Sequence, residues 1–405
     1  MVRVLPPGGP GLAAESFEVS CADGGGHATM TTVRAGSTPA ALFGVYELAR
    51  RAGFGFMHPL HIVKPARPDW CQNFQGGPLG GPGSSGFKAA NANVAHAAMV
   101  RGTHIHTQHP IELADVLNGV GRVRAGGGVG APSEEEEAWK AGLRTWTMYL
   151  QWLVANKQNL VEWALLEWGS PDGFSTSDTR RRRLSELVAM AQEWGLRVAI
   201  DAPMNLQQQH AWRLQTGDLG GSWEAVVKRI DWLCSLGVDE VSTEIGSTEF
   251  SHTDPHTTVA LLNTTVAYLS GKGRRLVVKN HVSTKQVAKG YKSPLRGSSQ
   301  DLNFNYITYH ADPRVISAPH TVQMYALEDP LVGSYGRHDF GDVREMMGIF
   351  EREGKPQVFF PETAYWVDFD NSVPLFLPLY ATDRLRDIQL LAREAPSAGH
   401  LNFES

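Results

Sequence analysis

The chain of 405 residues is poor in cysteine, with only Cys21, Cys71 and Cys234. These three lie far apart, and no pair has the CxxC spacing that is typical of zinc clusters and redox motifs. We therefore expect neither a structural zinc cluster nor a small fold held together by disulfides.

Long apolar runs and an excess of positive charge are also missing. No segment reaches the roughly 18 uninterrupted apolar residues of a membrane span, and the first residues lack the apolar core of a signal peptide. The formal net charge of −5 gives no electrostatic attraction to nucleic acid or to an anionic membrane. We expect a soluble protein with neither partner, while the compartment and oligomeric state stay open. Because the chain starts close to a strand and stops at "HLNFES" without a capping element, trimming at either end is an open alternative.

The sequence pattern changes near residue 100. Before it, "SFEVSC" and "HATMTTVRAG" alternate as strands do, and "STPAALFGVYELARRAGFGF" predicts a helix with Ser37 or Thr38 at its N-cap and Gly53 past its end. The segment "NFQGGPLGGPGSSGF" is rich in glycine and proline and poor in apolar residues. We predict a small α/β domain over residues 1–72 and a connector over 73–100.

Apolar runs alternate with amphipathic helices after Arg101, a pattern that indicates a parallel sheet. Eight runs over this length predict a (β/α)8 TIM-like barrel over residues 101–395, with a doubly wound open sheet as the alternative. Units five and six fit poorly, because "STKQVAKGYKSPLRGSSQ" is a poor helix and "ADPRVISAPH" is short for a crossover. The predicted strands are "GTHIHTQHP", "NLVEWALLEW", "LRVAIDAP", "DEVSTEIG", "RRLVVKNHV", "FNYITYHADP", "TVQMYALEDP" and "QVFFPETAYW".

Polar residues follow the apolar part of each predicted strand, which places them at the C-terminal face where TIM barrels carry their active sites. Aromatic residues such as Trp163 and Tyr309 lie near the same ends, and flat aromatic rings beside carboxylates suit a sugar. We expect a carbohydrate substrate. The candidate substrate-binding residues are His104, His106, His109, Glu167, Asp201, Lys279, His281, His310, Tyr325, Asp329, Tyr365 and Trp366.

Three glutamates are candidates for catalysis. Glu244 ends the predicted fourth strand and Glu249 follows in its loop, while Glu362 ends the predicted eighth strand in "FFPETAYW". Hydrolysis of a glycosidic bond needs one carboxylic acid to protonate the leaving oxygen and one carboxylate to attack or to activate water. Glu244 or Glu249 can supply one group and Glu362 the other from across the barrel. Burial against Tyr365 and Trp366 is expected to raise the pKa of Glu362, as an acid catalyst requires.

The segment "GSTPAALFGVYELARRAGFGFMHP" resembles the small α/β domain that precedes the barrel in β-hexosaminidases of glycoside hydrolase family 20, in α-glucuronidases and in related enzymes. The Arg101-Gly102 pair that opens the first barrel strand is similar too. The resemblance covers roughly the first hundred residues, and it implies a glycoside hydrolase with a TIM barrel.

In that group the catalytic acids commonly lie on the fourth barrel strand, which here is the predicted strand of Glu244. Family 20 enzymes have an adjacent Asp-Glu pair at the end of that strand, whereas Asp239 and Glu240 stand here at its beginning. This departure argues against their substrate-assisted mechanism for N-acetyl sugars.

A metal-dependent, amidohydrolase-like hydrolase is an alternative. In "HIHTQH", His104 and His106 have the HxH spacing that such barrels use on their first strand, and further histidines follow later. Those enzymes need an aspartate at the last strand end, where this chain offers Glu362. Neutral histidines that bind sugar hydroxyls explain the same residues, so we expect no metal and no cofactor.

Two further alternatives keep a glycan as the ligand. A polysaccharide lyase would use Lys279 or His281 as base and Tyr309 or Tyr365 as acid. A barrel that binds glycan without turnover would need no catalytic residue at all.

Overall fold

The computed structural model forms two compact units, of which the first comprises Met1–Met99, Leu143–Asn159 and Met190–Leu196 and the second the rest of the chain. The structure describes residues 2–4, 16–24, 27–66, 84–89, 99–107, 113–121, 132–167, 174–205, 210–215, 222–246, 253–281, 286–296, 298, 300–321, 325–332, 338–362 and 377–404.

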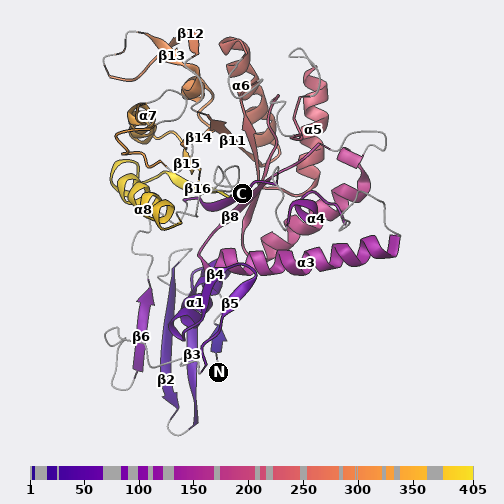
Figure 1. Ribbon diagram of the computed structural model, residues 1–405, viewed down its shortest axis with the longest axis vertical. Helices are drawn as coiled ribbons and strands as arrows, with labels where there is room; N and C mark the ends of the chain where they lie inside the picture. The colour runs from indigo at the N-terminus through magenta and orange to yellow at the C-terminus, as the bar shows by residue number, and fades with distance from the viewer. Residues whose placement is uncertain are drawn as a thin grey trace. The chain divides into compact units, whose positions relative to one another are not determined.

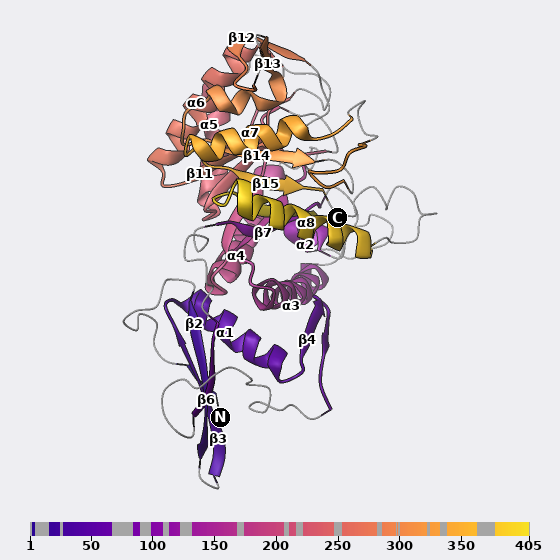
Figure 2. The ribbon, with the colours of Figure 1, turned by 90° about the vertical axis from the view of Figure 1, so that its left-hand side faces the viewer.

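The first unit contains a four-stranded sheet in the order β1-β3-β2-β6, on which helix α1 (Thr38–Arg51) packs (Figure 2). The helix begins where predicted, because the Ser37 hydroxyl accepts a hydrogen bond from the Ala40 amide at 3.3 Å. Strand β6 lies inside the segment predicted as a connector, where it pairs antiparallel with β2. The strands are β1 (Val2–Val4), β2 (Phe17–Gly24), β3 (His27–Ala35), β4 (Gly55–His58), β5 (His61–Val63) and β6 (Ser84–Ala89).

The second unit contains a closed barrel of eight parallel strands, which confirms the predicted TIM-barrel fold. Around the barrel the strand order is β7-β8-β9-β10-β11-β14-β15-β16, and β16 closes the ring by pairing with β7. The barrel strands are β7 (Arg101–Ile105), β8 (Leu160–Ala164), β9 (Arg197–Asp201), β10 (Glu240–Glu244), β11 (Arg275–Asn280), β14 (Ile316–Thr321), β15 (Val358–Pro361) and β16 (Gly399–Glu404).

Helices α4, α5, α6, α7 and α8 are arranged around these strands (Figure 1). None of the described helices is both long enough and apolar enough to cross a membrane. The remaining elements are α2 (Ala114–Leu117), α3 (Pro132–Ala155), η2 (Phe174–Thr176), α4 (Asp178–Glu193), α5 (Trp223–Ser235), α6 (Pro255–Gly271), β12 (Val287–Lys292), β13 (Asp301–Asn303), η3 (Phe304–His310), α7 (Gly341–Arg352) and α8 (Leu377–Glu394).

Two of the eight predicted strands are wrong. "FNYITYHADP" forms the 3-10 helix η3 instead, capped by the Asn303 side chain, because its aromatic and β-branched residues bury Phe304 and Ile307 without entering the sheet. "TVQMYALEDP" contributes only Thr321 to β14, which lies mainly in the stretch judged too short for a crossover. The closing strand β16 was not predicted, so Glu362 follows the seventh barrel strand rather than the eighth.

An apolar layer fills the barrel interior. Its members come from β8, β9, β11, β14, β15 and β16, together with Val100 just before β7. Where one strand contributes two of them they stand two positions apart, because residues i and i+2 of a strand point to the same face. They form one cluster of buried side chains: Val100, Leu160, Ala199, Val277, Ile316, Ala318, Val358, Phe360 and Leu401.

Gly102 lies in this layer at a point of close approach. A Cβ atom at Gly102 would lie 2.9 Å from the Cδ2 atom of Leu160 and 2.9 Å from the Cδ1 atom of Leu401. Both leucines are 2% exposed, so they have little space in which to move away.

We predict that Gly102→Ala lowers the free energy of unfolding by about 1–3 kcal/mol through overpacking. Adding Leu401→Val should recover part of that loss, because it removes the methyl group that the new Cβ would contact. A double-mutant cycle in urea unfolding measures the coupling. Strictly additive effects of the two changes would show that the interior has room for the methyl group.

Candidate active site

A layer of polar side chains lies directly above the apolar layer, at the C-terminal ends of the strands. Each of these residues stands two positions after an interior residue of the same strand and therefore points into the barrel as well. The layer comprises His104 after Gly102, Glu162 after Leu160, Asp201 after Ala199, Lys279 after Val277, His320 after Ala318 and Glu362 after Phe360. Glu244 joins it, because it is in register with Lys279 on the neighbouring strand.

His104 and Glu162 form the first contact of this layer. They are directly paired in register on β7 and β8, and the His104 Nδ1 atom lies 2.7 Å from the Glu162 Oε1 atom. A carboxylate can only accept, so we assign the proton of the neutral imidazole to Nδ1. His104 is fully buried and Glu162 is 1% exposed. A pair this deep needs its polar atoms satisfied within the protein.

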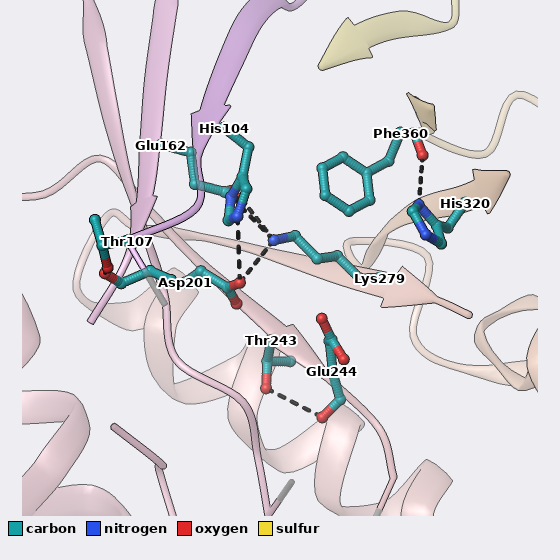
Figure 3. Close-up of polar contacts among 10 residues, drawn as sticks. His104, Thr107, Glu162, Asp201, Thr243, Glu244, Lys279, His320 and Phe360 are labelled. Atoms are coloured by element: carbon teal, nitrogen blue, oxygen red, sulfur yellow. Dashed lines mark hydrogen bonds and ion pairs between the residues drawn. The ribbon is translucent and has the colours of Figure 1, made fainter. Parts of the chain in front are cut away.

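Lys279 is the cation at the centre of the layer (Figure 3). Its Nζ atom lies 2.8 Å from Glu162 Oε1, 2.7 Å from Asp201 Oδ2 and 3.2 Å from His104 Nδ1. Lys279 is 3% exposed, so one buried ammonium neutralises charge on two buried carboxylates from neighbouring strands. The four side chains form one cluster, which we call the lysine cluster.

Burial alone would lower the pKa of Lys279, because it removes the ammonium from water. The negative charges of Asp201, Glu162 and Glu244 outweigh this effect and raise the pKa above its ordinary value. Lys279 is therefore positively charged near pH 7. The pKa of His104 is lowered well below its usual value, first by burial and then by the charge of Lys279. His104 is therefore neutral near pH 7.

Aromatic rings flank the other side of Lys279. Its Nζ atom lies 4.5 Å from the centroid of the Phe360 ring, which is a cation–π distance. His320 packs on the same ring, and its Nδ1 atom donates to the Phe360 carbonyl at 2.9 Å. Burial lowers the pKa of His320 to about 4, although the bond to the carbonyl opposes this. His281 lies next to His320, with ring centroids 5.2 Å apart.

His104, Glu162 and Asp201 have the side chains and the proximity of a metal site, since one ligand atom of each lies within 4.8 Å of the others. His106, the second histidine of the HxH pair, does not belong to this group, and its ring lies 5.8 Å from that of His104. The Lys279 ammonium, however, already lies within hydrogen-bonding distance of both carboxylates. A divalent ion there would meet its positive charge at close range, so the group suits the ammonium better than a metal.

Glu244 and Glu362 belong to the same polar layer but come from different sides of the barrel. Glu244 is partly exposed at the end of β10, and its charge is one of those that raise the pKa of Lys279. Glu362 is 3% exposed, and its backbone carbonyl accepts a hydrogen bond from Arg384 Nη1 at 3.3 Å. Arg384 therefore brings a positive charge near Glu362 that sequence reasoning did not anticipate.

Several predicted binding residues have other environments. Glu167 forms an ion pair with Arg229 at 2.5 Å, and Arg229 in turn stacks on a tryptophan ring. His310 ends η3, where its Nε2 atom lies 2.9 Å from the Lys292 carbonyl, so it is not at a barrel strand end. Asp329 accepts a hydrogen bond from the Ala326 amide.

The carbonyl of Tyr325 accepts a hydrogen bond from Arg384 Nη2 at 2.7 Å. Trp163, expected to stack on a sugar, is fully buried, and as the neighbour of Glu162 it points to the outside of the barrel. Tyr309 lies in η3, and its hydroxyl bonds to Glu353. Four predicted site residues lie outside the described part of the chain: His109, Glu249, Tyr365 and Trp366.

Sequence reasoning missed Glu162, which contacts both His104 and Lys279. The signal was present in "NLVEWALLEW", where a glutamate interrupts an apolar run. A charged residue inside a buried strand needs a partner of opposite charge, and Lys279 on another strand could have been sought for that role. Phe360 was also missed, because nothing in "VFFP" says which of the two rings faces inward.

No protein-family profile matches the chain, and no curated protein matches it by sequence. One solved structure of similar fold is a family 20 β-N-acetylhexosaminidase from Streptomyces coelicolor, with 11% sequence identity and a TM-score of 0.46. Another is a family 138 enzyme targeting pectin rhamnogalacturonan II, with 10% sequence identity and a TM-score of 0.49. A third is a family 20 exo-β-N-acetylglucosaminidase from Vibrio harveyi, with 9% sequence identity and a TM-score of 0.46. The matches cover 89%, 95% and 89% of this chain, but only 63%, 40% and 51% of those chains. The chain thus spans about two-fifths to two-thirds of their length, and at these identities the likeness concerns the fold alone.

We predict that Lys279→Met lowers the free energy of unfolding by about 3–5 kcal/mol at pH 7, because it leaves two buried carboxylates without their cation. Two buried carboxylates without a cation destabilise the variant only while they are charged, so its stability would increase as the pH falls. The loss should therefore be smaller at pH 5 than at pH 7. Urea unfolding at both pH values measures it. Lys289→Met, at an exposed position of β12, is the control. Equal losses at both positions would mean that the buried ammonium of Lys279 contributes no more to stability than an exposed lysine does.

We also predict that a chelator changes neither the melting temperature nor any activity of the protein, because the ammonium occupies the centre of the candidate metal group. Elemental analysis of the purified protein checks this directly. About one transition-metal ion per chain, lost on mutation of His104, would contradict the assignment.

Proposed function

We propose that the protein is a glycoside hydrolase whose active site is the polar layer at the C-terminal end of the barrel. The observation that carries the proposal is the presence of two carboxylates, Glu244 and Glu362, above the same barrel interior in addition to the two that pair with Lys279. TIM-barrel enzymes place their catalytic groups at this end, and glycosidic hydrolysis uses two carboxyl groups in different roles.

In this proposal the lysine cluster forms the floor of the site. Glu162 and Asp201 are each engaged in an ion pair with the Lys279 ammonium, so we assign neither of them the role of proton donor. Their function is to fix the Lys279 ammonium and the neutral His104 ring beneath the substrate. Polar groups held in this way can bind sugar hydroxyls with little loss of side-chain entropy.

Glu244 is proposed as the base or nucleophile. Its attraction to Lys279 is mutual, so the buried ammonium favours a negatively charged Glu244. Its partial exposure at the end of β10 leaves it accessible to a substrate.

Glu362 is proposed as the acid. Its side chain is 3% exposed, so water is largely excluded from it, and the positive charge of Arg384 lies nearby. The predicted roles of Tyr365, Trp366 and Glu249 around these groups stay part of the proposal.

The environments of the other candidates weaken the alternatives. A lyase would need a neutral base, but the charges around Lys279 raise its pKa and keep it protonated. Tyr309, one of the two proposed lyase acids, lies in η3 with its hydroxyl bonded to Glu353. A barrel that binds glycan without turnover is distinguished from the proposal by activity alone.

We expect that Glu244→Gln and Glu362→Gln each abolish glycan hydrolysis while they change the free energy of unfolding by no more than about 1–2 kcal/mol, because each removes a charge at constant volume. A panel of oligo- and polysaccharides, read by new reducing ends and by ultraviolet absorbance, first identifies the substrate and separates hydrolysis from elimination. Glu353→Gln, an isosteric change at an exposed residue that follows α7 and bonds to Tyr309 of η3, is the control. Near-normal activity of either active-site amide variant would remove that residue from the mechanism.

A further inference from the structure

A cavity opens beside the polar layer, between helices α5 and α6, which lie next to one another in both ribbon views (Figures 1 and 2). Its volume is about 350 Å³, within the range of small-molecule sites. Met204 and Asn205, which follow β9, form part of its wall, and Ile245 and Gly246, which follow β10, form another.

The described residues of this cavity wall are mostly apolar and carry no positive charge. Trp223 and Val226 contribute from α5, and Leu261 and Leu262 from α6. None of the described lining residues is a lysine, arginine or histidine. Asp254, the one carboxylate among the described lining residues, accepts hydrogen bonds from the Thr257 amide and hydroxyl as the N-cap of α6. This part of the wall therefore offers an anionic ligand a negative charge and no cation.

One polar atom in the cavity wall lacks a partner. Asn205 is 4% exposed, and among the described residues nothing donates a hydrogen bond to its Oδ1 atom. A buried amide oxygen without a donor is costly, and such an atom in a cavity wall indicates a ligand that supplies the donor. An amide oxygen only accepts, so the ligand must offer a hydroxyl or an N–H group.

We propose that this cavity binds a neutral, largely apolar group that carries one hydrogen-bond donor, and that the donor binds Asn205 Oδ1. Ile245 and Gly246 come directly after Glu244, so a group bound here would lie beside the carboxylate at the end of β10. On the proposed glycosidase function, the group is the aglycone of a glycoside, and this last step rests on that function.

Direct binding of benzyl alcohol, with benzyl methyl ether as the probe that lacks the donor, tests the cavity without any need for activity. Titration calorimetry on the full chain should show benzyl alcohol binding about two- to tenfold more tightly than the ether. In Asn205→Leu, which removes the amide at similar volume, the two affinities should become equal. Equal affinities in the unchanged protein would overturn the role of Asn205.

Leu261→Phe fills the cavity and should abolish binding of both probes. Ala260→Phe places the same ring at the neighbouring exposed position of α6 and should leave binding unchanged. Melting temperatures establish that each variant is folded. If Leu261→Phe binds benzyl alcohol as well as the unchanged protein does, the probe binds elsewhere and the proposal fails.

Steady-state kinetics then distinguish the proposed role of the cavity from the proposed catalytic function. With the sugar identified, Leu261→Phe should raise KM several-fold for its benzyl glycoside and leave the methyl glycoside unaffected, since only the larger aglycone reaches α6. Unchanged KM for both, with hydrolysis intact, would refute the aglycone assignment while the glycosidase proposal stands. Probe binding without hydrolysis of any glycan would leave the cavity as a ligand site and refute the catalytic proposal.

Discussion

The buried ammonium of Lys279 is the interaction on which the candidate site depends. It lies within 2.8 Å of oxygens from two carboxylates that come from β8 and β9, while Lys279 itself belongs to β11. Three strands are therefore joined at one point above an apolar barrel interior. Because the charges are buried, each partner needs the others, and the imidazole of His104 stays neutral beside the ammonium.

The alternation of side chains along each strand explains why the polar layer and the apolar layer are both possible in one barrel. In β9, with the sequence "RVAID", Ala199 points into the apolar layer, and Asp201, two residues later, points into the polar layer. Six strands, β7, β8, β9, β11, β14 and β15, repeat this step around the ring. The apolar layer contributes stability by burial, whereas the polar layer costs desolvation that its ion pairs and hydrogen bonds must offset.

Much of this arrangement could be predicted from the sequence, because periodicity is local. The strands that end in Asp201, Glu244 and Lys279 are apolar runs with a polar end, and the structure places all three side chains in one layer. The contacts between strands were harder to predict, since no local sequence pattern indicates that Glu162 pairs with Lys279. Strand β14 was missed because the sequence analysis assigned most of "ISAPHT" to the crossover "ADPRVISAPH", whereas in the barrel this segment pairs with β11 and Pro319 lies opposite Asn280. The 3-10 helix η3 was misjudged because tertiary packing overrode its strand-like composition.

The pairing of β16 with β7 has a consequence for how the chain reaches its fold. His400 lies opposite Arg101, so the ring closes between residues that about three hundred others separate. Until β16 arrives, β7 and β15 each present an unpaired edge, and open edges are templates for pairing with other chains. Closure over so long a loop is also slow. During synthesis the nearly complete barrel would thus remain an open sheet that exposes its apolar interior, a stage at which protection by chaperones would matter more than the final stability of the protein.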